Sequence, residues 1–461
     1  MSTTQAFSDW AVETDFKSLP PAVVNAARRL IEESVAVSIL GGGMRLGRRI
    51  GTSKGIGDMA YATGAVGDTT SLARAAFVNA AWADCNDSAG GSYTAPLHPA
   101  KNLVPATLAV ALTEGASGAD VIRAVSLGTE FAFRLDASIG LEHMARGHYS
   151  DGPIGALASA VAVGALTRLD RQALAHAIDL AVLLAPATVG GQNMWVASGR
   201  PLALGRAAAT GIEAARAAAG GIAGPVDAVA CAGGFASALA GHADVNSILA
   251  ELGDSWHCVR HYLKPFVGCK LTHPAREGLQ ILKREEGLQA EQVSRIVVHH
   301  PLYDLPVIRH QPRGGENEVA YSCSSPYLMA CSLLYDELGP EVFASKRMSD
   351  VAAHELSQRI SVVEDPELTA LYAQGMSARG ASGTPIRMVV ERVGAPPLTY
   401  VTNRVKGDPF EGWEVTDPEL DHKFQRYVDG RLSPKQAEAA LAMFRDLGAV
   451  DDVRLLADLL R

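Results

Sequence analysis

The chain has 461 residues, of which 48% are hydrophobic and 20% are charged. A chain of this length can bury a large core and is long enough for two or three domains. Its formal net charge of -9 argues against nucleic acid or an anionic membrane as the main partner. A local basic pocket for an acidic substrate remains compatible with that charge.

The N-terminal stretch and the cysteines lead us to expect a cytoplasmic protein. The opening stretch MSTTQAFSDWAVETDF lacks the basic segment and apolar run of a secretory signal. No stretch reaches the roughly 18 uninterrupted apolar residues of a membrane span. The six cysteines form no Cys-x-x-Cys pair, which is typical of reduced thiols in a chain of this length.

The first 260 residues are expected to be almost wholly helical. A helix is predicted over 20–40, with Pro20 and Pro21 at its start and the glycines at 41–43 as its end. Alanine-rich segments broken by Gly or Asp predict further helices. These helices are expected over 70–86, 101–115, 118–138, 152–167, 171–187 and 203–219.

The pattern changes near residue 264. Runs of β-branched residues predict strands over 295–299 and 386–393, with helices over 317–337 and 351–359 between them. A further strand-like run follows Pro397, and residues 417–461 are again helical in pattern. We therefore predict a mainly α fold, with a large all-helical domain over 1–263 and 398–461 and a smaller α+β lid domain over 264–397.

Two loops carry a histidine just before a helix. In the first, over 84–106, Asp84 and Asp87 precede a glycine-rich loop and His98. A loop histidine at a helix entrance can exchange protons with a ligand, although a surface histidine with structural aspartate caps fits the same pattern. In the second, GHYSDGPIG at 147–155, His148 precedes a helix start whose free amides favour an anion.

Two later segments carry further candidates. Residues 261–276 gather Lys264, Lys270 and His273 near the expected domain junction, where clefts are common. Clustered cations would lower the pKa of a lysine and make it a usable base, although a surface basic patch is the simpler alternative. Tyr327 lies near a helix start and could act as an acid, or could be a core tyrosine.

No metal or organic cofactor is expected. His299 and His300 are adjacent in a predicted strand and would point to opposite faces. The sequence has no HExxH motif, its cysteines are too scattered for an iron–sulfur cluster, and it lacks the GxSxG elbow of a serine nucleophile.

Taken in order, these regions resemble the MmgE/PrpD family, which contains 2-methylcitrate dehydratase, cis-aconitate decarboxylase and iminodisuccinate epimerase. The resemblance covers nearly the whole chain. It rests on several motifs in register, among them HPAKNLVPATLAVALTEG, GRAAATG, LKPFVGCKLTH, CSSPYLMACSLL and VKGDP. It implies a helical domain, a smaller lid, an active cleft between them and a homodimer.

The resemblance also implies particular site residues. The acidic position of the family falls on Asp84, and its hydroxyl position, usually Thr, falls on Ser88. The two catalytic histidines fall on His98 and His148, the lid lysine on Lys264 and the tyrosine on Tyr327.

Three positions depart from the family pattern. Arg200 and Ala203 stand where Lys and His are common. An arginine can clamp a carboxylate but cannot act as a base. Cys269 stands where some decarboxylases have His.

The sequence thus predicts a cofactor-independent lyase that removes a proton next to a carboxylate of a small hydroxy- or unsaturated polycarboxylate. Arg200, with Lys270 or His273, would grip carboxylates. Lys264 or His148 would exchange the carbon proton, and His98 or Tyr327 would act as the opposite acid. Two alternatives stay open: an epimerase of an amino- or imino-dicarboxylate, and an inactive homologue that only binds polycarboxylates.

Overall fold

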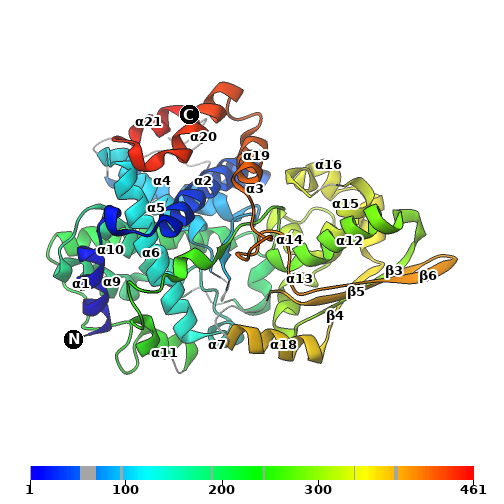
Figure 1. Cartoon of the computed structure of the whole chain (residues 1–461), viewed down its shortest axis with the longest axis horizontal. Helices are drawn as coiled ribbons and strands as arrows, with labels where there is room; N and C mark the ends of the chain where they lie inside the picture. Colours follow the sequence, from blue (N-terminus) through cyan, green and yellow to red (C-terminus); the bar gives the residue numbers. More distant parts are fainter. Residues whose placement is uncertain are drawn as a thin grey trace.

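A computed structural model describes residues 2–51, 69–93, 97–187, 190–241, 244–336, 338–377 and 383–460. Alanine-rich helices form the larger part of the molecule, and a four-stranded sheet with its own helices extends from one side (Figure 1). The predicted fold class, mainly α with a smaller α+β part, is confirmed.

The long helix α2 (Pro21–Gly43) shows why small residues matter in this core. It begins at a proline as predicted, but it continues through the three glycines that were expected to end it. A Cβ atom on Gly41 would lie 1.8 Å from the carbonyl oxygen of Trp82 in α4 (Thr69–Asp84). The glycines therefore let the two helices approach closely.

The other predicted helices of this part are present with small shifts of their ends. The all-buried helix α8 lies at the centre and packs against α5, α6, α9 and α10. Their bounds are α5 (Leu103–Glu114), α6 (Gly118–Ile139), α8 (Pro153–Leu166), α9 (Arg171–Leu184) and α10 (Arg200–Ala219). Shorter helices are α1 (Thr3–Glu13), α3 (Arg45–Gly51), α7 (Glu142–Ala145) and α11 (Phe235–Ala240).

The expectation of an almost wholly helical first 260 residues is wrong in one stretch. Between α10 and residue 263, the described chain forms only α11, short 3-10 turns and the strand β2 (His261–Tyr262). β2 pairs with β1 (Gly91–Ser92) in antiparallel fashion. This small pairing joins the loop after α4 to the segment that enters the lid.

The larger sheet has the strand order β4-β3-β5-β6, in which only β3 and β4 are parallel. The strands are β3 (Val293–His300), β4 (Ile360–Glu364), β5 (Ile386–Arg392) and β6 (Ala395–Thr402). Side chains of α12 (His273–Glu286) and α15 (Ser325–Tyr335) share a core with β3 and β5. The boundary proposed at residue 397 falls inside β6.

The remaining lid helices are short. The helix predicted over 317–337 is two helices, α14 (Glu318–Ser322) and α15, because the chain breaks at Cys323-Ser324 and Pro326 occupies the first turn of α15. The others are α13 (Leu305–Ile308), α16 (Ser345–Met348), α17 (Val351–Ser357) and α18 (Pro366–Ser377).

The C-terminal helices lie on the helical part. They are α19 (Asp417–Val428), α20 (Pro434–Arg445) and α21 (Arg454–Leu459). Phe424 and Phe444 belong to the same apolar core as residues of α2 and α5, so this end of the chain packs against the helical part.

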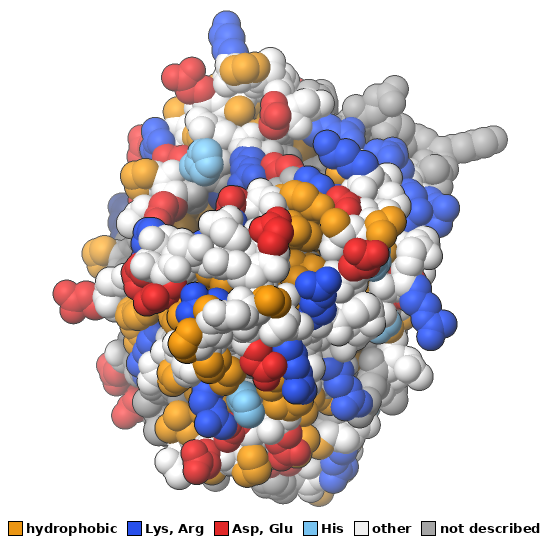
Figure 2. All heavy atoms as spheres, turned by 90° about the vertical axis from the view of Figure 1, so that its right-hand side faces the viewer, with side chains coloured by type: hydrophobic (Ala, Val, Ile, Leu, Met, Phe, Trp, Pro, Cys, Tyr) orange, Lys and Arg blue, Asp and Glu red, His pale blue; other side chains and the backbone are white. Residues whose placement is uncertain are grey.

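The surface at the sheet end carries both signs of charge. Lys and Arg side chains lie among Asp and Glu side chains there, with apolar atoms between them (Figure 2). Within the described residues, no helix has the length and apolar character needed to cross a membrane.

Candidate active site

Two buried aspartates at the end of α4 collect three cations. Asp84 is the last residue of α4, and Asp87 lies in the following loop with a positive φ of 49°. The ammonium of Lys101 lies 2.9 Å from Asp84 and 2.6 Å from Asp87. Arg200, at the start of α10, makes two contacts of 2.8 and 3.2 Å to the Asp84 carboxylate. Together with Lys264, which binds Asp87 from the lid side, two carboxylates and three cations therefore form one buried network.

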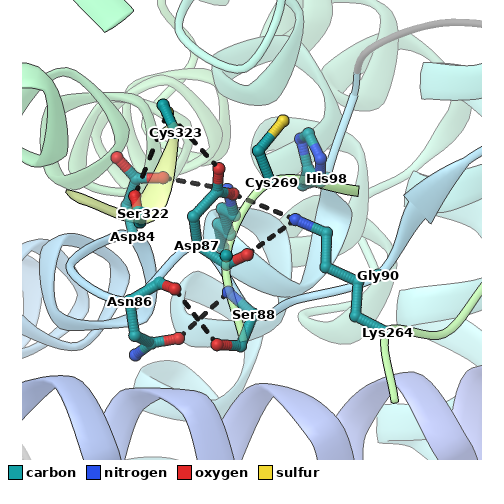
Figure 3. Close-up of polar contacts among 12 residues, drawn as sticks. Asp84, Asn86, Asp87, Ser88, Gly90, His98, Lys264, Cys269, Ser322 and Cys323 are labelled. Carbon is teal, nitrogen blue, oxygen red and sulfur yellow. Dashed lines mark hydrogen bonds and ion pairs between the residues drawn. The ribbon is translucent and has the colours of Figure 1, made fainter. Parts of the chain in front are cut away.

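Asp87 is also bound from the lid side. The Lys264 ammonium donates to the Asp87 carbonyl oxygen at 2.7 Å and to its carboxylate at 3.0 Å. Figure 3 shows Lys264 and Cys323 approaching Asp87 from different sides. Burial opposes ionisation of Asp87, but the nearby Lys101, Lys264 and Arg200 outweigh it and hold its pKa well below the usual range.

His98 is held by Asp151 and faces Tyr262. The Asp151 carboxylate accepts from the His98 backbone N–H at 2.6 Å and from Nδ1 at 2.8 Å, while Nε2 lies 3.1 Å from the Tyr262 hydroxyl. Burial and the nearby Lys101 lower the pKa of His98 below 6.5, although Asp151 opposes them. The imidazole is therefore neutral at pH 7, with its proton on Nδ1 and a basic Nε2.

Of these groups, Asp87, Arg200, His98 and Tyr262 line a cavity of about 110 Å³ between the helical part and the lid. Its polar lining includes Asp87, His98 and Tyr149 from the helical part and Cys269 and Lys270 from the lid side. Lys270 pairs with Asp408, and its ammonium lies 4.2 Å from the ring centroid of Tyr262 and 4.7 Å from that of Tyr93. Burial lowers the pKa of Lys270, against the effect of Asp408. The arrangement offers a neutral base, tyrosine hydroxyls and a cation around one small space.

The structure brings together only part of the predicted site. His98, Arg200, Cys269 and Lys270 line the cavity. Arg200 is bound to Asp84, the Trp195 carbonyl oxygen and the Cys323 sulfur, so its guanidinium is held by groups of the protein itself.

His148 lies elsewhere. Its Nδ1 contacts the Ala187 carbonyl oxygen at 3.1 Å, and its side chain lines two other hollows. His148 is not among the residues that line the cavity of His98, although it lines a hollow that shares Leu141, Met144 and Trp195 with that cavity. Its neighbour Tyr149 lines the cavity instead, and burial, with the Asp151 charge, raises the pKa of that phenol well above 10.

Tyr327 and His273 are buried away from the cavity. The Tyr327 hydroxyl donates to the Val342 carbonyl oxygen at 2.6 Å within the core. His273 Nε2 lies 3.2 Å from the Gly268 carbonyl oxygen, and its ring packs near Phe266. Neither residue is among those lining the cavity.

Asp84, Ser88 and Lys264 lie behind the cavity lining. The Ser88 hydroxyl donates to the Asn86 carbonyl oxygen, and the Ser88 carbonyl oxygen accepts from Lys423. Lys264 reaches Asp87 but is not among the lining residues. These three residues therefore support the loop that carries Asp87.

Sequence reasoning missed five residues of the site. Lys101, Asp87, Asp151 and Tyr149 belong to the two histidine loops. Tyr262 lies two residues before Lys264. The nearness of Asp151 and Tyr149 to His148 was the one available signal. Nothing in the sequence shows which members of these loops point inward.

No group of three or more His, Cys, Asp or Glu side chains is arranged to hold a metal ion in the part of the chain that the structure describes. The six cysteines are free thiols.

Comparison with family models places this architecture among known proteins. A cavity between a helical part and a lid, lined by acidic, basic and tyrosine side chains, is typical of a site for a small ligand. Residues 5–248 match the MmgE/PrpD N-terminal domain, and residues 266–449 match the MmgE/PrpD C-terminal domain. The chain belongs to the MmgE/PrpD family, whose members are in general hydro-lyases.

Proposed function

We propose that this protein is a lyase that removes a proton from the carbon next to the carboxylate of a small acid, with His98 as the base. The observation that carries this proposal is the Asp151–His98–Tyr262 chain at the wall of the cavity. A carboxylate that fixes one ring nitrogen leaves the other nitrogen oriented and basic.

Proton removal builds negative charge on the substrate carboxylate, and that charge needs a partner. Lys270 lines the cavity and carries the ammonium nearest to its aromatic wall. We propose that Lys270 binds the substrate carboxylate and stabilises the enolate-like state. Tyr149, whose raised pKa keeps it protonated, is the proposed acid for the leaving hydroxyl.

In a dehydration, the C–H electron pair forms the double bond and the C–O bond breaks. His98 takes the carbon proton, and the leaving hydroxide takes a proton from Tyr149 and departs as water. Decarboxylation and epimerisation begin from related carbanionic states, so the exact reaction is part of the proposal. A hydroxy- or unsaturated polycarboxylate is the substrate class that the family resemblance favours.

Three further expectations belong to this proposal. The protein works without an organic cofactor or metal, it is cytoplasmic, and it forms a homodimer. Exposed apolar side chains at the end of α9 support the dimer, since Leu183 is 63% exposed and Leu184 is 44% exposed.

The test is proton exchange in heavy water, followed by proton NMR, with a panel of small acids that includes citrate, malate and amino-dicarboxylates. We expect deuterium at the carbon next to the carboxylate, together with an alkene product. Deuterium at that carbon without an alkene product would favour the alternative that the protein is an epimerase. Binding of these acids without any proton exchange would support the alternative that the protein is an inactive homologue.

The variant pair His98→Gln and His148→Gln separates the two histidines. We expect His98→Gln to reduce exchange by about 10²- to 10⁴-fold, the usual contribution of a general base. His148→Gln should retain activity because His148 lies outside the cavity. Full activity of the His98→Gln variant would show that His98 is not the base.

A further inference from the structure

A second buried polar cluster adjoins the loop that carries Asp151. It consists of Asp136 in the last turn of α6, His143 in α7 and Ser150, and all three side chains are buried. His143 Nε2 lies 2.5 Å from the Ser150 hydroxyl and 4.0 Å from the Asp136 carboxyl group. None of the three residues lines the cavity of His98, and the proposed reaction uses none of them.

Asp136 is the unusual member of this cluster. Among the residues that the structure describes, no hydrogen bond reaches either of its carboxyl oxygens, which would be costly for a buried carboxylate. Burial and the charge of Asp151 raise the pKa of Asp136 well above its usual range, against the effect of the Ser150 hydroxyl. Asp136 is therefore a neutral carboxylic acid at pH 7, with one O–H to donate.

His143 is neutral as well. Burial lowers its pKa to about 4, and the nearby His148 acts in the same direction, while the Gly140 backbone and Glu142 oppose them. A neutral acid, a hydroxyl and a neutral imidazole can form hydrogen bonds without adding a second negative charge beside Asp151.

Ser150 stands between two residues that act at the cavity. Tyr149 lines the cavity, and Asp151 holds His98 through its backbone N–H and its Nδ1. The Ser150 side chain is instead held by His143, outside the lining. A hold on Ser150 therefore fixes the short segment that carries both neighbours.

We propose that Asp136 and His143 are positioning residues, which hold the Ser150 hydroxyl between them and thereby fix Asp151 against His98. This inference rests on the proposed function, in which His98 is the base. The Asp136 carboxyl group donates to the Ser150 hydroxyl, and that hydroxyl donates to His143 Nε2. When Ser150 is released, Asp151 is free to move, and His98 loses part of the contact that fixes its tautomer.

Histidine NMR of the free protein tests this inference without any substrate. The ¹³C and ¹⁵N signals of labelled His98, assigned with the His98→Gln variant, report its pKa and the ring nitrogen that carries the proton. Ser150→Ala and Asp136→Leu each remove one group of the chain. Because Asp151 raises the pKa of His98, we expect a lower pKa and a mixture of tautomers in both variants.

Two further variants serve as controls. Asp136→Asn keeps a neutral polar group of the same shape and should retain the wild-type pKa and tautomer of His98. Ser159→Ala removes another buried hydroxyl, which donates to the Gly155 carbonyl oxygen within α8, and should leave His98 unchanged. Thermal unfolding of Asp136→Leu should give a Tm close to that of the wild type, since an apolar side chain replaces a neutral buried acid of similar size.

The possible outcomes separate this inference from the proposed function. Unchanged His98 signals in either Ser150→Ala or Asp136→Leu would overturn the positioning role. A lower His98 pKa in Asp136→Asn would also overturn it, because Asp136 would then act as an anion. Neither result bears on whether His98 is the base, which the proton-exchange assay of His98→Gln decides.

Discussion

Asp151 determines both the orientation and the protonation of His98. Its carboxylate accepts from the backbone N–H and from Nδ1 of the same histidine, so the ring is fixed at two points. Burial opposes the ionised form of Asp151, but His98 and Lys101 outweigh it and lower its pKa. Asp151 therefore stays an acceptor at neutral pH and keeps the proton of His98 on Nδ1.

We predict that Asp151→Asn moves the acid limb of the kcat/KM profile to lower pH. The limb reports protonation of His98, whose pKa is already below 6.5 through burial, and Asp151 is a group that raises it. Removing that charge lowers the pKa further. The rate should also fall, by about 10²- to 10⁴-fold, because the ring loses its fixed tautomer.

The matched control for this prediction is Asp365→Asn. Asp365 contacts His299 at 3.6 Å on the lid sheet, outside the cavity lining. Its replacement should leave the pH profile unchanged. An acid limb that moves upward in Asp151→Asn would contradict the role given to Asp151.

His98 and His148 show how much of the site could be predicted residue by residue. His98 was predicted from its place before a helix, and it does line the cavity. His148 has the same sequence setting, yet Tyr149 faces inward. The segment around His148 is an irregular loop, where neither the helical nor the strand period tells which of two adjacent side chains points to the core.

At the scale of elements, Lys423 on α19 joins three separate segments. Its ammonium contacts Glu33 of α2 at 2.5 Å and the carbonyl oxygens of Ser88 and Lys264 at 2.8 Å. Glu33 in turn accepts from the Gly90 N–H at 2.6 Å. Lys423 of α19 therefore joins α2, the loop that carries Asp87 and the start of the lid.

We predict that Lys423→Met lowers both stability and activity. The substitution leaves Glu33 buried without its cation, and breaking a buried pair typically costs about 3–5 kcal/mol. The loss of two carbonyl contacts should loosen the Asp87 loop and reduce kcat/KM. Thermal unfolding and steady-state kinetics measure the two effects.

The double variant Lys423→Met with Glu33→Gln separates the two causes. It should recover part of the lost Tm, since no buried charge is left unpaired, but little of the lost kcat/KM. Lys406→Met, which breaks a more exposed pair with Glu419, is the control and should change neither quantity strongly. Parallel recovery of Tm and activity would show that Lys423 acts through stability alone.

Helix positions were predictable because alanine-rich apolar segments with clear Gly and Asp breaks leave few alternatives. The predictions that were wrong concerned features that depend on contacts between elements. Gly41 to Gly43 were expected to end a helix, but Gly41 and Gly42 instead allow the close approach of Trp82. The strand β4 was not predicted, because its five residues gain strand structure by pairing with β3.

At the scale of the whole molecule, the cavity exists because distant segments converge. Lining residues come from the loops after α4 and before α5, from the start of α10 and from the lid. Charged residues in those segments were recognisable in the sequence, but their pairing was not. Arg200 was expected to bind substrate, and its contacts to Asp84 are a tertiary fact that no spacing encodes.

The predicted homodimer would use an exposed apolar surface at the end of α9. Leu183 and Leu184 end α9, and Val226, which is 82% exposed, follows Pro225. Pro225 lines an apolar hollow together with Val182 and Ala185. Exposed apolar side chains grouped around such a hollow are typical of a subunit contact.

We predict that the wild-type protein has the mass of a dimer in light scattering at micromolar concentration, and that Leu184→Asp with Val226→Glu shifts it toward a monomer. Charges placed in an apolar contact lose hydration on association, so the dimer is weakened. Val351→Glu, at a 68% exposed position on α17, is the matched control and should leave the mass unchanged. A monomeric wild type would end the dimer proposal. A dimer that survives both charges would instead place the contact on another face.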